Sequence, residues 1–228
     1  MTPVNHVSRS LEPPSLSAIG IGISVYYLLL SWTTLVAGDT GSDRLVLHGI
    51  IGSFGGGVAG LGGFAAVYFL RSRSLFALGV RPVRAQWIIP AIALGIAGYG
   101  VSLIVQHVSG VSGQLVDDPQ PTLRASVQAG LMPFVLSFIG GAILTPIGEE
   151  FLFRGVVANA LNRYGAWAGV GLSALIFGIV HGSGMTLLLA ITIGLLSGML
   201  FRTTGSVWPS VGLHATYNGM HSMAYAFS

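Results

Sequence analysis

Three polar clusters interrupt the apolar second half of this chain, and their residue types could together hydrolyse a peptide bond. In chain order they are Glu149-Glu150-x-x-x-Arg154, Phe177-x-x-x-His181 and His214-x-x-x-Asn218. Ionisable side chains cost roughly 2.5–3.5 kcal/mol each at the centre of a membrane helix, so acids and bases in such apolar sequence indicate a functional site.

The paired acids divide naturally into one structural and one reactive carboxylate. On a helix, Glu150 and Arg154 lie one turn apart and can pair, with the acid on the favourable N-terminal side of the base. Glu149 points about 100° away, which keeps its carboxylate available for chemistry. The alternative is that both acids only neutralise arginines and hold helices together.

The histidines have a similar pair of interpretations. A lone histidine in a membrane helix, such as His181, is often only a hydrogen-bonding contact between helices. His214 and Asn218 share one helix face, which His221 extends at i+7. Two polar side chains on one face of an apolar helix need a buried partner or a cavity, and this favours a site.

An acid, two imidazoles and an amide could perform hydrolysis without a covalent intermediate. A carboxylate and an imidazole on neighbouring helices can share one water and remove its proton during attack on a carbonyl. The second imidazole and the amide could stabilise the oxyanion, a contribution of about 3–4 kcal/mol per donor. Zinc bound through Glu149, His181 and His214, with water in the fourth position, is an alternative that the spacing does not separate.

The composition predicts an all-α, polytopic membrane bundle. Of the 228 residues, 52% are hydrophobic and 7% are charged, whereas a soluble domain carries about 25% charged residues. Cysteine is absent, which rules out a thiol nucleophile and thiolate metal ligands. The few basic residues are scattered through hydrophobic sequence and form no basic face, so a nucleic-acid partner is not expected.

The apolar runs predict about seven transmembrane helices, with eight possible. They cover residues 16–37, 45–70, 87–108, 126–146, 167–180, 185–201 and 207–226. The segment 148–164 contains the acids and either extends the fourth span or lies partly embedded. We expect a disordered N-terminal arm over residues 1–14 and a single transmembrane domain over 15–228, with the catalytic core at 140–222.

Arginine placement orients the first half of the bundle. Arg71, Arg73, Arg81 and Arg84 cluster between the second and third spans, while aspartates mark the loops after the first and third. The positive-inside rule then puts the N-terminus and this loop in the cytosol. The fourth span would return to the cytosolic side and deliver Glu149 near that face.

The many glycines are expected to pack helices. Several follow one another along the second span, including Gly55-Gly56-Gly57 and Gly60. Small residues allow helix backbones to approach closely in a bilayer. A phosphate loop is excluded because no Gly-Lys-Ser/Thr follows.

The three clusters, in this order, resemble the CAAX-protease and bacteriocin-processing (CPBP, or ABI) family, which includes the Ras-converting CAAX endopeptidase. The resemblance covers about residues 140–222. It rests on Glu-Glu-Phe-Leu-Phe-Arg-Gly at 149–155, Phe-Gly-Ile-Val-His at 177–181 and Val-Trp-Pro-Ser-Val-Gly-Leu-His-Ala-Thr-Tyr-Asn at 207–218.

The resemblance implies roles for the same residues. Glu149 and His181 would activate the water, while His214 and Asn218 would form the oxyanion site. Structural or substrate-orienting roles would fall to Glu150, Arg154 and Phe177. By likeness to the Ras-converting branch no metal cofactor is expected, with zinc the alternative. The substrate would be a membrane-associated protein or peptide, either lipidated or not, at a bacterial inner membrane.

Two other functions are compatible with this sequence. A non-catalytic bacteriocin-immunity or chaperone-like membrane protein could keep the same fold. A proton-coupled transporter could use glutamates and histidines as a relay, although such transporters usually consist of repeated halves, and no repeat is visible here.

Overall fold

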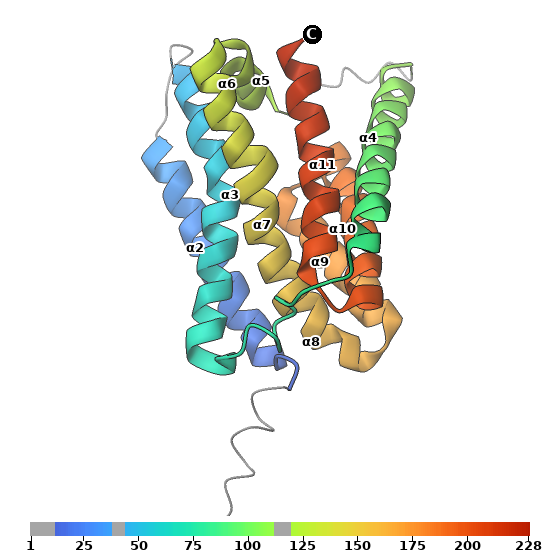
Figure 1. Ribbon diagram of the computed structural model, residues 1–228. Helices are drawn as coiled ribbons and strands as arrows, with labels where there is room; N and C mark the ends of the chain where they lie inside the picture. Colours follow the sequence, from blue (N-terminus) through green and yellow to red (C-terminus); the bar gives the residue numbers. More distant parts are fainter. Residues whose placement is uncertain (1–11, 38–43, 112–119) are drawn as a thin grey trace, which may run out of the picture.

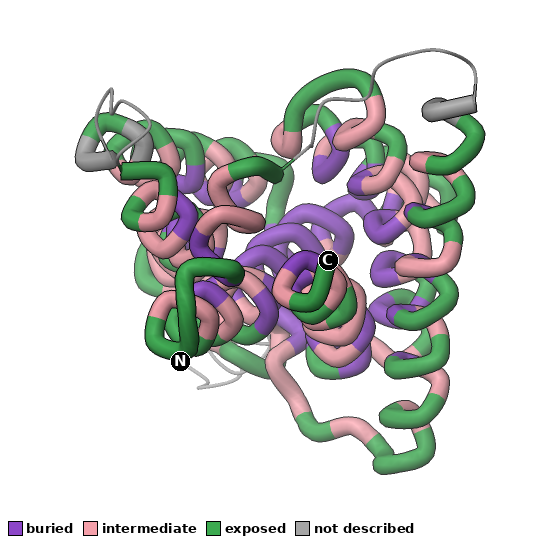
Figure 2. The backbone as a smooth tube through the Cα atoms, turned by 90° about the horizontal axis from the view of Figure 1, so that it is seen from above, coloured by how far each residue is buried: buried purple, intermediate pink, exposed green. Residues whose placement is uncertain are grey.

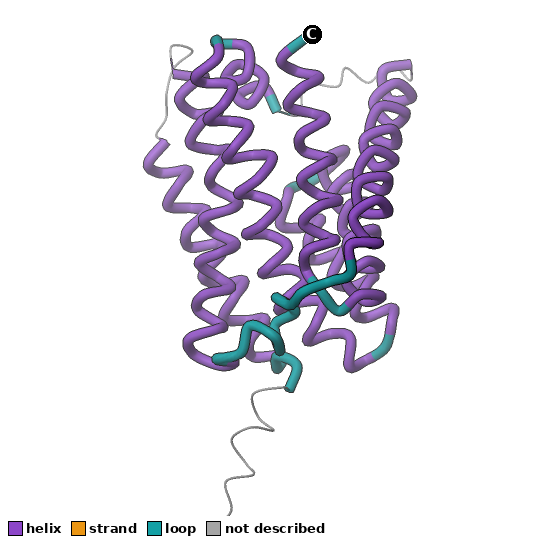
Figure 3. The backbone as a smooth tube through the Cα atoms, in the orientation of Figure 1, coloured by secondary structure: helices purple, strands orange, loops and turns teal. Residues whose placement is uncertain are grey.

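The computed structural model describes residues 12–37, 44–111 and 120–228, and within these ranges the regular structure is entirely helical. The long helices stand side by side as a bundle (Figures 1 and 3). The expected all-α architecture is therefore confirmed. The predicted disordered arm over residues 1–14 lies outside the described residues up to residue 11. The aspartate-bearing loops at 38–43 and 112–119 lie outside them as well.

The predicted spans correspond closely to the long helices. These are α2 (Leu16–Ala37), α3 (Leu45–Val67, extended by a π-helical turn over Tyr68–Ser72), α4 (Ile88–Val111), α10 (Gly184–Thr204) and α11 (Val207–Ala226). Both ends of α2 and of α11 fall where the sequence predicted them. α9 (Ser173–His181) continues a π-helical segment over Trp167–Leu172.

The fourth span differs from the prediction of a helix over residues 126–146. A short helix, α5 (Pro121–Gln128), ends before Gly130, whose φ of 112° is rarely adopted by residues with a side chain. A new helix begins at Leu131 and runs without interruption to Tyr164. It comprises α6 (Leu131–Phe138), α7 (Thr145–Glu150) and α8 (Asn159–Leu161), joined by π-helical segments over 139–144 and 151–158. The acids thus extend the fourth span, one of the two predicted options.

Glu149 lies well inside this long helix. Glu149 follows Leu131 by 18 residues and precedes Tyr164 by 15, which correspond to about 27 Å and 22 Å of helix. Its carboxylate therefore lies near the middle of this helix, somewhat closer to its C-terminal end.

Five helices in the described part of the chain are long and apolar enough to cross a membrane. The apolar helix over Trp167–His181 is shorter, and its 15 residues reach about 22 Å, less than the roughly 30 Å hydrocarbon core. α11, with 20 residues, is long enough to cross a membrane, but its hydropathy is lower than that of those five helices. Together with these two the helices form a polytopic membrane bundle.

The distribution of buried residues is that of a membrane protein. The large fully buried side chains include Arg154 and Glu150, whereas Leu35, Ile89 and Trp167 are 74%, 77% and 89% exposed. Buried positions gather at the centre of the bundle and exposed ones face outward (Figure 2). Charge inside and large apolar side chains outside suit a lipid surround, so the chain is an integral membrane protein.

Glycines bring α3 and α7 into backbone contact beside the acids. A Cβ atom on Gly148 would meet the backbone of Gly57, and one on Gly60 would meet the backbone of Gly148. The Thr145 hydroxyl accepts a hydrogen bond from the Gly57 N–H (3.0 Å) and donates one to the Ser53 carbonyl (2.8 Å). The hydroxyl therefore bridges a backbone N–H and a backbone carbonyl that lie one turn apart on α3. The predicted packing role of these glycines is confirmed.

Candidate active site

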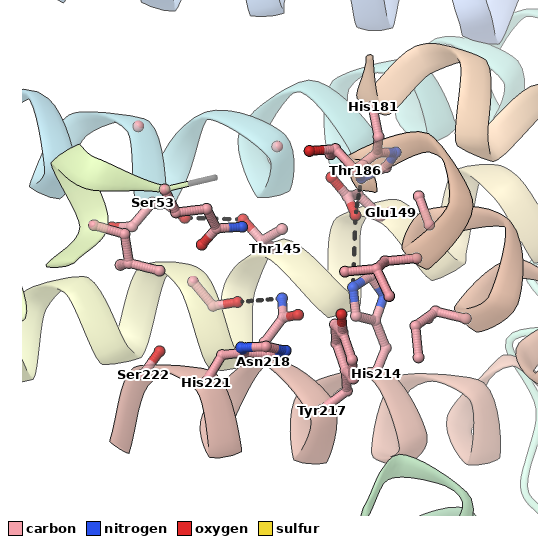
Figure 4. Close-up of a pocket in the computed structure, with 18 of the residues that line it drawn as sticks. Ser53, Thr145, Glu149, His181, Thr186, His214, Tyr217, Asn218, His221 and Ser222 are labelled. Atoms are coloured by element: carbon pink, nitrogen blue, oxygen red, sulfur yellow. Dashed lines mark hydrogen bonds and ion pairs between the residues drawn. The ribbon is translucent and has the colours of Figure 1, made fainter. Parts of the chain in front are cut away.

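Glu149, His181 and His214 come together from three helices. Glu149 lies at the end of α7, His181 ends α9, and His214 lies in α11 (Figure 4). The Glu149 Oε2 atom is 3.4 Å from Nε2 of His181 and 3.9 Å from Nε2 of His214. The carboxylate is only 3% exposed, and its Oε2 makes no hydrogen bond to the described protein. One carboxylate oxygen thus faces two imidazole nitrogens in a buried space.

The other oxygen of Glu149 is held by a tyrosine that the sequence did not indicate. The Tyr26 hydroxyl of α2 donates to Glu149 Oε1 over 3.3 Å, and Tyr26 is buried. A Cβ atom on Gly56 of α3 would lie 2.5 Å from the same Oε1. Tyr26 therefore orients the carboxylate, and the glycine leaves room for it. No local pattern could have revealed Tyr26, which is 123 residues away in sequence.

The hydrogen bonds of the two imidazoles assign their tautomers. His181 Nδ1 lies 2.7 Å from the Phe177 carbonyl oxygen, and His214 Nδ1 lies 3.0 Å from Glu150 Oε1. Both partners are acceptors, so each Nδ1 carries the hydrogen. In the neutral rings each Nε2 then presents a lone pair toward Glu149. Three acceptors facing one another call for a hydrogen donor between them, and a water molecule supplies two hydrogens.

Glu150 and Arg154 form the predicted i,i+4 pair, and both are fully buried. Glu150 Oε2 lies 2.8 Å from Arg154 Nε, and Arg154 Nη2 donates to Glu150 Oε1 over 3.3 Å. The guanidinium also lies over the Phe177 ring, 4.8 Å from its centroid. The same ring packs against His181 at 4.1 Å and edge-on against His214 at 5.8 Å. These contacts hold the rings of both histidines in place, which fits a structural role for Glu150, Arg154 and Phe177.

Asn218 lies one turn beyond His214 on α11 and faces the same space (Figure 4). Its Nδ2 donates one N–H to the Gly141 carbonyl over 2.8 Å, which leaves the second N–H for another acceptor. His221 follows on this face, but its Nε2 lies 3.1 Å from Ser102 Oγ. It packs between Tyr99 and Tyr217 and takes no part in the cluster around Glu149.

These polar groups line one cavity of about 560 Å³. Its walls come from α2, α3, α4, α5, α7, α9, α10 and α11 and include Glu149, His181, His214 and Asn218. The volume is within the range of ligand pockets. It suffices for an extended stretch of a few residues together with a water molecule.

Zinc binding through Glu149, His181 and His214 was the alternative reading. The tautomers would suit a metal, because metal-bound histidines usually donate their other ring N–H to a carboxylate or carbonyl. Within residues 12–37, 44–111 and 120–228, however, no group of three or more His, Asp or Glu side chains is arranged to hold a metal ion. The donor types fit zinc, and the separations of 3.4 Å and 3.9 Å between Glu149 Oε2 and the two Nε2 atoms leave zinc binding as the alternative.

Comparison with known proteins points to the same part of the chain. The family model described as "Type II CAAX prenyl endopeptidase Rce1-like" matches residues 131–220, which overlap the predicted core at 140–222. A relative in Bacillus subtilis (strain 168), described as "Putative membrane peptidase YdiL", is 30% identical over 136 residues. That match covers 56% of this chain and 54% of the relative, so it spans about half of the relative's length. No solved structure matches the chain.

The matched region contains all three polar clusters and the four residues assigned to water activation and the oxyanion site. The resemblance inferred from the motifs is thus confirmed by an independent comparison. Residues 131–220 of this chain are therefore similar to the type II CAAX prenyl endopeptidase Rce1-like family.

Proposed function

We propose that this protein is an intramembrane endopeptidase that hydrolyses a peptide bond of a membrane-associated protein or peptide. One observation carries the proposal: Glu149 Oε2 faces Nε2 of His181 at 3.4 Å and Nε2 of His214 at 3.9 Å beside a cavity. A water bound there would donate one hydrogen to Glu149 and the other to His181. Both acceptors would then hold its oxygen lone pair toward the substrate carbonyl.

The reaction balances without a covalent enzyme intermediate. The water oxygen attacks the carbonyl carbon, one water proton passes to Glu149, and the C=O electron pair moves to the carbonyl oxygen. When the tetrahedral species collapses, the C–N bond breaks and Glu149 returns the proton to the leaving nitrogen. The products are a carboxylic acid and an amine, and Glu149 is again a carboxylate.

The oxyanion would be stabilised by His214 and Asn218. His214 Nδ1 already donates to Glu150, so its Nε2 must also carry a hydrogen when it donates to the oxyanion. Asn218 contributes the N–H that Gly141 does not take. Each preorganised donor of this kind is worth about 3–4 kcal/mol of barrier.

The test uses purified protein and a library of fluorogenic peptides. Glu149→Gln and His181→Ala should each lower kcat/KM by at least roughly a thousandfold, because they remove the groups that bind the attacking water. His107→Ala, at an exposed position of α4, is the matched control and should retain full activity. Thermal unfolding must show that all variants fold. Undiminished cleavage by folded Glu149→Gln would reject the proposal.

We propose a metal-free reaction, in which Glu149 and His181 alone bind the attacking water. Elemental analysis of active protein should find less than about 0.1 zinc per chain, and chelators should leave the cleavage rate unchanged. Stoichiometric zinc, with activity lost on chelation and restored by zinc, would replace this mechanism with the zinc alternative.

We place the protein in a bacterial cell membrane with a cytosolic N-terminus, supported by the bacterial relative and by the arginine distribution. The substrate is best sought by comparing peptide termini in membranes from cells carrying wild type or Glu149→Gln. New termini seen only with wild type would identify the substrate and reveal any lipid on it. A non-catalytic immunity or chaperone-like role predicts instead that protection survives alanine at all four proposed catalytic positions.

A further inference from the structure

Arginines are strongly concentrated at one end of the bundle. This end, which we call the arginine face, is formed by the loop between α3 and α4, the turn after α8 and the turn between α10 and α11. Its arginines are Arg71, Arg73, Arg81, Arg84, Arg163 and Arg202. The opposite end, which we call the distal face, carries α5 and the C-terminus (Figure 1). Its described arginines are Arg44 and Arg124.

The N-terminal segment lies at the arginine face. Arg163 Nη2 donates to the carbonyl oxygens of Pro13 (3.1 Å) and Pro14 (2.6 Å), directly before α2 begins. Membrane proteins keep arginine-rich short loops in the cytosol. The arginine face is therefore cytosolic, and the distal face is extracytoplasmic.

The cavity reaches from the site only toward the distal face. α3 contributes residues between Gly49 and Gly56, in its distal half, and α4 contributes Gln106 near its distal end. Residues 120–123 at the start of α5 and Tyr225 in the last turn of α11 also line it. Residues 57–105, 150–176 and 194–213, which include every described segment of the arginine face after α2, contribute no lining residue.

On the cytosolic side the site is closed by the loop between α3 and α4. Leu78 of this loop is fully buried. The loop is tied down at both sides: Asn159 donates to the Ala77 carbonyl (2.7 Å), and Arg81 Nε donates to the Gly205 carbonyl (2.5 Å). The Val207 N–H also donates to the Gly79 carbonyl over 3.0 Å.

The remaining space beneath Glu149 is filled by its own helix. Leu152, Phe153, Val156 and Val157 are all fully buried. A close-packed interior of this kind leaves no passage for a polypeptide. The site is therefore closed toward the cytosol, although it lies closer to the cytosolic end of the bundle than to the distal end. His214 is seven residues, or about 10 Å, from the cytosolic start of α11 and twelve residues, or about 18 Å, from its distal end.

We infer that the substrate segment reaches Glu149 from the extracytoplasmic face, through the cavity between α3, α5 and α11. This inference rests on the proposed function for the cleavage itself, and it names the side from which that cleavage takes its substrate. The class of substrate is then an exported or outer-leaflet polypeptide and not a cytosolic tail. Because His214 lies about 18 Å from the distal end of α11, at least roughly five extended substrate residues must enter the cavity to reach the site.

The absence of cysteine from this chain allows a direct test by thiol labelling. Gly52→Cys places a thiol in the cavity, and a Cβ atom at Gly52 meets nothing within 4 Å. Ala85→Cys, at an exposed position of the arginine face, reports the opposite side. Leu28→Cys, 70% exposed on the lipid-facing side of α2, is the control for a thiol outside water. A membrane-impermeant maleimide is added to spheroplasts or to inverted vesicles.

Gly52→Cys should react at least tenfold faster in spheroplasts than in inverted vesicles, Ala85→Cys should show the reverse, and Leu28→Cys should react in neither. Labelling of Gly52→Cys from the same side as Ala85→Cys would overturn the inference. So would a Gly52→Cys thiol that reacts from neither side but becomes reactive in SDS.

A functional arm separates this inference from the proposed protease activity. Maleimide attached to purified Gly52→Cys should block peptide cleavage at least tenfold, while the same reagent on Ala85→Cys should leave it unchanged. If wild type cleaves no peptide at all, the protease proposal fails, yet the labelling pattern still decides which face the cavity opens to. If cleavage survives a fully labelled Gly52→Cys, entry through this cavity is excluded.

Discussion

His214 Nδ1 lies 3.0 Å from Glu150 Oε1, so the second acid of the pair positions a histidine that faces the first acid. Glu150 is itself held by Arg154 at 2.8 Å, and all of this is buried in the bundle. Adjacent carboxylates thus have different tasks: Glu149 faces the cavity, and Glu150 fixes the tautomer and orientation of a ring on another helix.

Glu150→Gln should reduce both stability and activity. It leaves the Arg154 guanidinium buried without a counter-charge, which costs about 3–5 kcal/mol. It also removes the carboxylate that accepts the hydrogen bond from His214 Nδ1. The double variant Glu150→Gln/Arg154→Met should recover most of the stability, because an uncharged pair needs no charge compensation. Thermal unfolding in detergent and kcat/KM measure the two effects.

The double variant distinguishes structural from chemical roles. If Glu150 serves only to pair with Arg154, restoring stability should restore cleavage. We expect cleavage to remain at least tenfold low, since His214 still lacks its carboxylate partner. Full activity in the stable double variant would contradict the positioning role.

Tyr26→Phe should lower kcat with little change in KM. The hydroxyl donates to Glu149 Oε1 over 3.3 Å and so orients the oxygen that faces the histidines. Losing one such hydrogen bond costs about 1–1.5 kcal/mol, or roughly fivefold to tenfold in rate. Tyr27→Phe changes the neighbouring, 42% exposed ring and should leave kcat unaltered. Equal kcat values for both variants would remove Tyr26 from the site.

The motifs and helix patterns predicted much of this arrangement, because they are local in sequence. The Glu150–Arg154 pair follows from helix geometry, and His214 with Asn218 follows from their shared face. The convergence of Glu149, His181 and His214 was expected from polar side chains that needed a buried partner. The comparison with known proteins supports the family but leaves the role of each residue a prediction.

Features that depend on tertiary contact were missed. Tyr26 lies in a predicted span in which the sequence indicated no site residue, and its partner is on a helix far along the chain. The break at Gly130 depends on a positive φ, which cannot be told apart among 34 glycines. The Glu150–His214 bond depends on which way a ring turns, and this is decided by packing against Phe177.

Gly148→Ala should destabilise the bundle and misplace Glu149. The added methyl would meet the backbone of Gly57, which cannot move aside without separating α3 from α7. Such overpacking costs about 1–3 kcal/mol, equivalent to a fall in Tm of roughly 2–12 °C for a chain of this size. Gly100→Ala is the control, because a Cβ atom there meets nothing within 4 Å. A Gly148→Ala protein as stable and active as Gly100→Ala would show that the contact is not needed.

Peptides with uncharged residues around the cut should be preferred over charged ones. Glu149 is the sole carboxylate among the described residues that line the cavity, and none of these is an arginine. A charged substrate side chain would therefore enter a low-dielectric space without a partner, which is costly. Replacing Asn by Asp, or Gln by Lys, within about three residues of the cut should lower kcat/KM at least tenfold. The same replacements six or more residues away should have little effect, because that part remains in water. Equal kcat/KM values for the charged and uncharged members of such a peptide series would contradict this expectation.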